Sequence, residues 1–356
     1  MGRRLALDAF ALRPTPRVPS FEVLEHPGLI REVTGIDPFD RPLEAWPRAC
    51  EALGIDWIVD IPRETYRFAP GEEVREIGGG RRVTEWGCSG SLWAEEPGFD
   101  TVEDVLSFRP LEDDRGVRVL QPEYQDERRR SAREAQAVAG DAVLVTGLYY
   151  TLLFQFSIMI FGWERFLEAA ASDPEAYAMV LDQLAAASRA NVAAWAADDS
   201  PVLFVHDDVA VTRGLVFSPA WCRHELLPRY EQILEPAFRA GKTVVFVSDG
   251  RFEELVDDLF AIGIHGVMVD HGNDLAGILA RHGRDRVVVG SVDTAVLTRG
   301  TPADVRAAVY RCMDLGRACP GFFLKAAGDI PHNVPLVNAR AYMSAKRELG
   351  ARGVTR

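Results

Sequence analysis

The chain has 356 residues, of which 47% are hydrophobic and 26% are charged, a balance typical of an ordinary globular protein. Acidic residues outnumber basic ones, 53 Asp and Glu against 40 Lys and Arg, which gives a formal net charge of −13 at pH 7. This charge argues against nucleic acid and against an anionic membrane surface as partners, because both attract basic proteins. No segment approaches the ~20 consecutive apolar residues that a membrane-spanning helix needs.

Cysteine usage and the first residues of the sequence bear on where the protein works. The five cysteines are odd in number and include no Cys-x-x-Cys pair, which is typical of reduced thiols and not of a disulfide framework. The first residues resemble a signal peptide only faintly, because Asp8 interrupts the apolar run and no cleavage site of small residues follows. We therefore expect a cytoplasmic protein.

From about residue 140 onward, short apolar runs alternate with amphipathic helical segments. The runs are rich in β-branched residues and continuously hydrophobic, as in strands buried on both faces of a parallel sheet. They cover residues 142–146, 202–205, 243–247, 266–269, 287–289 and 322–324. Helices are predicted to begin where a capping residue precedes a proline, at Asp173-Pro174, Ser218-Pro219 and Thr301-Pro302. This alternation predicts right-handed βαβ units and an α/β fold.

An open doubly wound sheet and a closed (β/α)₈ barrel both fit this alternation. The barrel is favoured because polar residues follow nearly every strand, whereas an open sheet concentrates its site at one switch point. No phosphate-binding glycine loop is found, and the three glycines at 78–80 predict instead the turn of a β-hairpin between 73–77 and 81–86. We therefore predict a single TIM-barrel domain over residues 1–356. Its expected parts are an irregular segment at 1–40, a helix at 43–53, the first barrel strand at 55–61, a hairpin insertion at 71–95 and a solvated helix at 126–134.

The carboxyl ends of barrel strands converge, so the residues just after each run are candidates for the site. Five of these strand ends carry an aspartate, and converging carboxylates raise one another's pKa until one stays protonated as a general acid. Any one of these aspartates could instead cap the following helix. The expected catalytic residues are Asp207, Asp249, Asp329 and His206. The expected substrate-binding residues are Arg63, Trp86, Tyr149, Asp208, Ser248, His271, Lys325 and His332.

Metal and nucleophile motifs are absent from the sequence. There is no His-x-x-x-His, His-x-His or paired-cysteine spacing, so we expect no bound metal and no tightly bound zinc. An oxygen-rich site formed by Asp249, Asp329 and a histidine remains open as an alternative, suited to a hard or borderline ion. No Gly-x-Ser-x-Gly motif is present, and Ser218 is explained as a helix cap.

Over roughly residues 15–350 the sequence resembles the uroporphyrinogen decarboxylase superfamily. The motifs that carry this resemblance are Val205-His206-Asp207-Asp208, Phe217-Ser218-Pro219, Leu227-Pro228-Arg229-Tyr230, Ala240-Gly241-Lys242, Ser248-Asp249-Gly250, Gly290-Ser291-Val292-Asp293 and Gly328-Asp329-Ile330-Pro331. Upstream, Thr84-Glu85-Trp86-Gly87 looks more like the methyltransferase-type branch than the haem-pathway enzyme. The resemblance implies a (β/α)₈ barrel with a deep cleft at the carboxyl ends of the strands.

The sequence departs from both well-known branches of that superfamily. Uroporphyrinogen decarboxylases carry an N-terminal Met-Arg-Gln-Ala-Gly-Arg motif, to which nothing here corresponds; Arg63 and Arg67 come nearest. The zinc-dependent, cobalamin-linked methyltransferases carry His-x-Cys and a later cysteine, where this chain has Val247, Asp249 and Asp329. Losing both thiolates and the imidazole removes the soft metal site of that branch.

Three functions are compatible with these observations. The favoured one is a cofactor-free decarboxylase acting on a carboxylate-bearing small molecule. In that enzyme Asp207 or Asp249 would hold the proton, His206 or His332 would adjust its pKa, and Arg63 and Lys325 would grip the carboxylate.

The alternative is a methyltransferase or demethylase that works with a corrinoid carried by a partner protein. The third is a non-catalytic binding protein on the same scaffold. The sequence leaves the substrate and the formation of a homodimer open.

Overall fold

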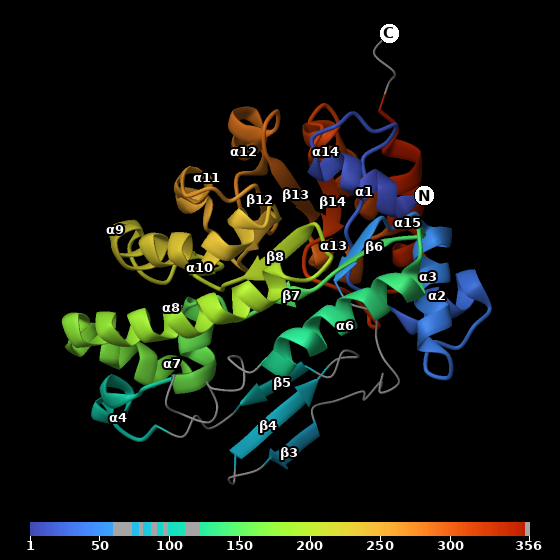
Figure 1. Cartoon of the computed structure of the whole chain (residues 1–356). Helices are drawn as coiled ribbons and strands as arrows, with labels where there is room; N and C mark the ends of the chain where they lie inside the picture. Colours follow the sequence, from blue (N-terminus) through green and yellow to red (C-terminus); the bar gives the residue numbers. More distant parts are fainter. Residues whose placement is uncertain (60–72, 78–80, 87–90, 95–98, 111–121, 353–356) are drawn as a thin grey trace.

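The computed structural model describes residues 1–59, 73–77, 81–86, 91–94, 99–110 and 122–352, and it shows parallel strands alternating with helices (Figure 1). Six of the strands form one sheet in the order β14-β13-β12-β11-β8-β7, and every neighbouring pair in it is parallel. These strands are β7 Leu148–Tyr149, β8 Val202–His206, β11 Thr243–Val247, β12 Gly266–Met268, β13 Val287–Val292 and β14 Phe322–Ala326. The α/β class predicted from the sequence is confirmed.

Two short connections close this sheet into a ring. A second parallel pair, β2 Trp57–Val59 with β6 Leu144–Thr146, continues into the sheet because only Gly147 separates β6 from β7. At the other edge, residues 20–21 lie between β14 and β2, through the parallel bridges Ser20 to Leu324 and Phe21 to Trp57. Eight strand segments thus surround one axis, which is the predicted (β/α)₈ barrel.

The first barrel strand is not the segment at 55–61, as expected, but the one near residues 20–25. The first forty residues, expected to be irregular, contain helix α1 Gly2–Phe10, strand β1 Leu24–Glu25 and helix α2 Pro27–Thr34. Strand β1 also pairs with β15 Ile330–Pro331. The first strand lacks a continuous apolar run because glutamates interrupt it, and this concealed it from the hydrophobic pattern.

Helices cover the outside of the barrel. Along the chain they are α3 Pro42–Leu53, α4 Val102–Ser107, α6 Pro122–Ala139, α7 Phe154–Ser172, α8 Pro174–Ala196, α9 Pro219–Trp221, η2 Cys222–Leu226, α10 Leu227–Arg239, η3 Glu253–Leu255, α11 Val256–Ala261, α12 Leu275–His282, α13 Thr294–Arg299, α14 Pro302–Gly316 and α15 Leu336–Leu349. All three predicted caps are present, since the side chains of Asp173, Ser218 and Thr301 accept hydrogen bonds from backbone N–H groups of the first turns. No helix within the described residues is long and apolar enough to cross a membrane.

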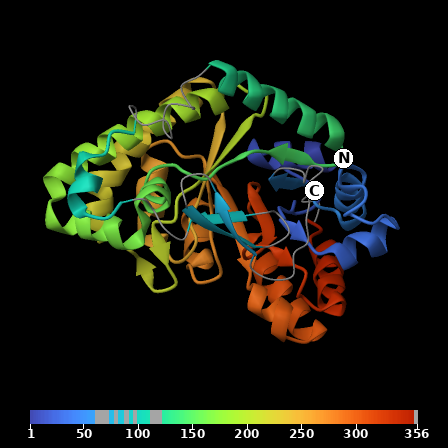
Figure 2. The same ribbon diagram turned by 90° about the horizontal axis from the view of Figure 1, so that it is seen from below.

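The predicted hairpin is present as the antiparallel pair β3 Glu73–Ile77 and β4 Arg81–Trp86. A third strand, β5 Ser91–Ala94, pairs with β4 and was not predicted. This sheet lies beneath the barrel in Figure 1 and in front of it in the view from below in Figure 2. It is inserted after the carboxyl end of β2, so it belongs to the layer of loops on that side of the barrel. A small β9–β10 pair, Ala210–Val211 with Gly214–Leu215, follows β8.

Strand alternation divides the core into two parts. Every second side chain points inward and packs in one cluster that includes Trp57, Phe204, Met268 and Phe323. The Phe10 ring of α1 joins this cluster, with its centroid 5.0 Å from that of Trp57 and 4.7 Å from that of Phe323. The side chains between these point outward and pack against the helices in a larger cluster. The same alternation decides which residues at the strand ends face the barrel axis.

Candidate active site

A cavity of about 1080 Å³ lies at the carboxyl ends of the strands. Its lining contains most of the polar and ionisable side chains that follow the strands. The polar side chains in the lining include Glu25, Tyr150, His206, Asp249, Lys325, Asp329 and His332. Helices α6 and α8 contribute Arg128 and Trp195, whose guanidinium and ring stack 3.5 Å apart. The site therefore lies where a barrel enzyme is expected to have it.

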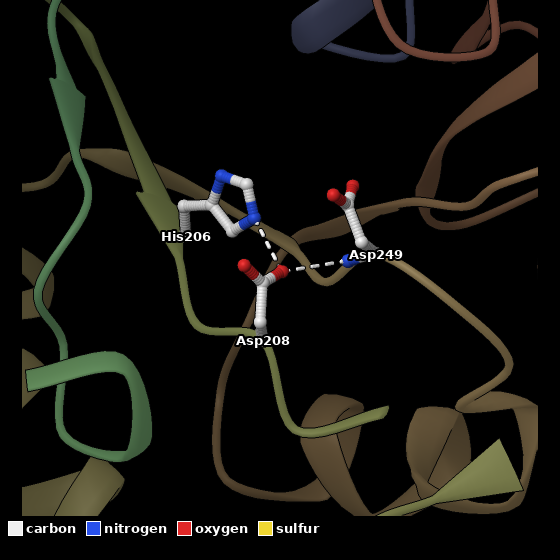
Figure 3. Close-up of side chains that lie close together, drawn as sticks. All are labelled: His206, Asp208 and Asp249. Carbon is white, nitrogen blue, oxygen red and sulfur yellow. Dashed lines mark hydrogen bonds and ion pairs between the residues drawn. The ribbon is translucent and has the colours of Figure 1, made fainter. Parts of the chain in front are cut away.

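The end of β8 presents a histidine–aspartate pair to this cavity. The Nε2 atom of His206 lies 2.6 Å from Oδ1 of Asp208, and the backbone N–H of Asp249 donates to the same oxygen at 2.9 Å (Figure 3). The hydroxyl of Tyr150 donates to the other oxygen of Asp208 at 3.3 Å, and its ring packs edge-on against the imidazole. Only 11% of the His206 side chain and 17% of the Asp208 side chain are exposed. Both oxygens of Asp208 are therefore held in place.

The surroundings shift the pKa values of Asp208 and Asp249 in opposite directions. Burial opposes ionisation of Asp208, but the hydrogen bond and the charge of His206 outweigh it and lower the pKa of that carboxyl. Burial raises the pKa of Asp249, and the nearby negative charge of Asp208 adds to this effect. The stronger anion of the two is thus Asp208.

A third acid, Asp329, follows Gly328, whose φ of 67° places it in the left-handed region that favours glycine. Burial raises the pKa of Asp329 to about 7, and the charges of Glu25 and Asp249 contribute to this rise while Lys325 opposes it. This carboxyl consequently retains a proton close to neutral pH, as a general acid requires. Glu25 was not predicted as a site residue, because it belongs to the barrel strand that the hydrophobic pattern failed to show.

Lys325 supplies a buried positive charge from β14. Its residue is 5% exposed, its Nζ lies 3.3 Å from the sulfur of Met268, and the Phe21 ring centroid is 5.9 Å away. Within the described residues, no carboxylate lies within ion-pair distance of this ammonium. A thioether is a weak acceptor, and the carboxyls of Asp249 and Asp329 interact with this charge only from beyond ion-pair distance.

Asp207, expected to be catalytic, does not line the cavity. It follows His206 directly, so alternation turns its side chain outward, where it is fully buried. Its carboxylate accepts hydrogen bonds from the backbone N–H groups of residues 153–155, at the start of α7, and from the hydroxyl of Tyr230 at 2.6 Å. Burial raises its pKa to about 6, although these hydrogen bonds oppose the rise. The structure assigns Asp207 to anchoring α7, which corrects the prediction.

Four residues expected to bind substrate also lie outside the cavity lining: Asp208, which holds His206, and Tyr149, Ser248 and His271. Tyr149 points into the core, where its hydroxyl lies 2.9 Å from Oγ of Ser188. Ser248 is buried and donates to the backbone oxygen of Asp249, and His271 is half-exposed at the surface. For two of these residues the neighbour faces the cavity instead: Tyr150 in place of Tyr149, and Asp249 in place of Ser248.

The remaining predicted residues divide into two groups. Asp249, Asp329, His206, Lys325 and His332 do line the cavity. Arg63 and the side chain of Trp86 lie outside the described residues.

Comparison with known proteins identifies the family. The family model for uroporphyrinogen decarboxylase (URO-D) matches residues 130–349. The chain belongs to the uroporphyrinogen decarboxylase family. A search of curated protein sequences finds no match.

The comparison with solved structures finds similar chains at low sequence identity. A methyltransferase from Methanosarcina mazei superposes with a TM-score of 0.64 at 17% identity, covering 98% of each chain. A Listeria monocytogenes protein described as a vitamin-B12-independent methionine synthase gives a TM-score of 0.47 at 14% identity, covering 94% of this chain and 98% of the other. The first likeness supports the barrel fold for the whole chain.

The donor set does not fit the thiolate zinc site of the methyltransferase branch. Val247 is a buried aliphatic side chain that cannot bind a metal, and Asp249 and Asp329 offer oxygen in place of sulfur. The cysteines of the described part of the chain, Cys50, Cys222, Cys312 and Cys319, do not line the cavity. Three other atoms do converge, because His206, Asp208 and Asp249 have potential ligand atoms within 4.8 Å of one another.

Proposed function

We propose that this family member removes a methyl group from a small carboxylate-bearing molecule and passes it to a corrinoid carried by a partner protein. The observation that carries this proposal is the presence, in one cavity, of the buried ammonium of Lys325 and of the Asp329 carboxyl, whose pKa burial raises to about 7. The first is suited to anchoring an anionic substrate, and the second to protonating a leaving atom.

The reaction follows from these two groups. The substrate carboxylate pairs with the Lys325 ammonium, which exchanges a weak thioether contact for a charge-assisted hydrogen bond. When bound, a reduced corrinoid would supply the electron pair for the new bond to the methyl carbon. The bond from that carbon to oxygen, nitrogen or sulfur breaks, and Asp329 gives its proton to the departing atom, which leaves neutral. The Asp329 carboxylate then regains a proton from solvent.

In this proposal, an acceptor carried by another protein would reach the cavity from the surface. Asp249 and Gly328 are exposed, so the cavity opens to the surface at the strand ends. The whole-chain likeness to a methyltransferase is our reason for preferring methyl transfer to the decarboxylation favoured by the sequence alone.

Cofactor-free decarboxylation is the second candidate, because Asp329 could equally protonate a carbanion left by loss of carbon dioxide. In that reaction the carbon–carbon bond to the carboxylate breaks, its electron pair stays on the substrate carbon, and the proton of Asp329 replaces the lost group. Lys325 would then orient the departing carboxylate and not a spectator group.

One experiment separates the two reactions. The protein is incubated anaerobically with free cob(I)alamin and a panel of small carboxylates that bear O-, N- or S-methyl groups. We expect the absorbance of cob(I)alamin to be lost as it is methylated, with the demethylated carboxylate detected by mass spectrometry. Carbon dioxide release from the same panel without cobalamin would replace methyl transfer with decarboxylation. Binding of a panel member with neither product would leave only the non-catalytic function.

A further inference from the structure

Three polar side chains from two neighbouring strand ends converge at the edge of the cavity. Strands β8 and β11 run parallel with His206 opposite Val247, so Asp208 and Asp249 lie at the same level, two residues further along each chain. The imidazole and the two carboxylates therefore meet, with ligand atoms within 4.8 Å of one another (Figure 3).

We propose that His206, Asp208 and Asp249 bind one divalent metal ion of hard to borderline character, such as Mn²⁺, Co²⁺ or Zn²⁺. One imidazole and two carboxylates are donors that such ions accept, in contrast to the thiolates of a soft site. This proposal departs from the expectation of no bound metal, and it uses a histidine from a different strand than the methyltransferase motif does.

The distances between the three side chains suit a metal ion that takes the place of the proton shared by His206 and Asp208. Ligand atoms bound at about 2.0–2.2 Å from a metal lie roughly 3 Å from one another. Nε2 of His206 and Oδ1 of Asp208 are already 2.6 Å apart, across the proton that they share. A slight opening of this pair and a rotation of the exposed Asp249 side chain would enclose an ion.

The surroundings of Asp208 favour a prepared site. The Tyr150 hydroxyl and the backbone N–H of Asp249 both donate to the Asp208 carboxylate and fix its orientation before any ion arrives. Hydrogen bonds of this kind to a ligand carboxylate position it and tune the metal. With three protein ligands, the ion keeps open positions toward the cavity, as catalytic sites do.

A second, independent observation points to a ligand at this place. Lys325 is 5% exposed and lines the same cavity, and the hydrogen bond found for its ammonium in the described part of the chain goes to a thioether. The charges of Asp249 and Asp329 interact with this ammonium, but within the described residues no carboxylate forms an ion pair with it, so the ammonium is free to bind an anion directly. An anionic ligand held jointly by the metal and Lys325 would compensate both charges.

The test measures metal binding and needs no substrate. The full chain, freed of metal with a chelator and carrying no affinity tag, is titrated with Co²⁺ by calorimetry and visible absorption. We expect one ion per chain, with the d–d absorption bands of protein-bound Co²⁺. His206→Ala, Asp208→Asn and Asp249→Asn should each weaken binding by more than the roughly 10–100-fold that loss of an outer-shell partner costs, because each removes a ligand atom. Circular dichroism confirms that each variant is folded.

A matched control comes from another strand-end pair. Nδ1 of His271 lies 3.9 Å from Oδ1 of Asp293, and neither residue lines the cavity. His271→Ala should therefore leave Co²⁺ binding unchanged. Absence of saturable binding up to millimolar Co²⁺, or equal affinity in the three ligand variants, would overturn the metal site. Because no turnover is measured, either result is independent of the outcome of the methyl-transfer experiment.

Discussion

At the scale of single residues, Lys325 is the side chain that is proposed to pair with the substrate carboxylate. Lys325→Ala should weaken binding of a carboxylate substrate by about 1.5–3 kcal/mol, because a charge-assisted hydrogen bond is lost. Calorimetry with a carboxylate from the panel measures this, and the methyl ester of the same compound serves as the control. The parent should prefer the acid, and the variant should bind both forms alike. If the variant keeps the preference of the parent, the anchor lies elsewhere, and Arg63, which the sequence analysis also expected to grip the carboxylate, is the next residue to replace.

Asp329 should make stability depend on pH. The native carboxyl has a pKa of about 7, raised from an ordinary value of 3.8, so between these values the folded state binds more protons than the unfolded one. Folding stability therefore falls as pH rises through this window. Asp329→Asn removes the cost of ionising the group, so the variant should melt at a higher temperature than the parent at pH 8 and gain little at pH 4. Melting curves at the two pH values decide this, and a difference that does not change with pH would contradict it.

The same scale shows what the sequence could and could not predict about the site. It correctly indicated that the strand ends converge, and Asp249, Asp329, His206 and Lys325 do line one cavity. It failed where adjacent residues were treated alike, as with Asp207 beside His206. Side chains in a strand alternate between two faces, and applying that period from the buried run onward selects every second residue. Strand alternation in the sequence could therefore have identified the cavity-facing residues. Glu25 is the exception, because its strand was not recognised.

At the scale of elements, Asp207 fixes the start of helix α7 against the end of β8. Its carboxylate satisfies three backbone N–H groups and the Tyr230 hydroxyl in the core. Asp207→Ala would leave these donors buried without an acceptor, so we expect the free energy of unfolding to fall by about 3 kcal/mol or more. Asp173→Ala is the matched control, because Asp173 caps α8 at the exposed surface and should cost only about 1 kcal/mol. Urea denaturation compares the two, and equal losses would show that Asp207 is no more than an ordinary cap.

The elements themselves were predictable to different degrees. Long buried strands and helices that begin with a cap and a proline carry local signals, and those at Pro174 and Pro302 begin where the sequence indicated. The strand near residues 20–25 that closes the barrel carries no such local signal, because glutamates interrupt its apolar run and its bridges to β14 and β2 are long-range. Its position follows from the ring as a whole and not from its own composition.

At the scale of the whole molecule, a buried polar network connects this closing strand to the C-terminal helix. Lys346 of α15 donates to Oγ of Ser20 at 3.0 Å and lies 3.6 Å from Oε1 of Glu22. The Tyr342 hydroxyl donates to the same glutamate at 2.7 Å. Arg17 pairs with the buried Asp56 through two hydrogen bonds of 2.7 Å, beside the start of β2. Segments more than 300 residues apart in the sequence are thus joined at the seam of the barrel, where residues 20–21 lie between β14 and β2.

This network predicts strong coupling between its two central charges. Burial raises the pKa of Glu22 and lowers that of Lys346, so each depends on the other to remain ionised. Lys346→Met alone should cost about 3–5 kcal/mol, because it leaves the Glu22 carboxylate buried without its cation. The double variant Glu22→Gln with Lys346→Met should lose less than the sum of the two single variants, since no unpaired charge remains.

Urea denaturation of the four proteins in this cycle measures the coupling. Glu32 and Arg340 provide the control pair, since they join α2 to α15 by an ion pair at the surface, where coupling should not exceed about 1 kcal/mol. Strictly additive losses at Glu22 and Lys346 would mean that the two charges do not stabilise each other. In that case the seam is held by backbone pairing and apolar packing alone, and the C-terminal helix contributes to closure only through its buried face.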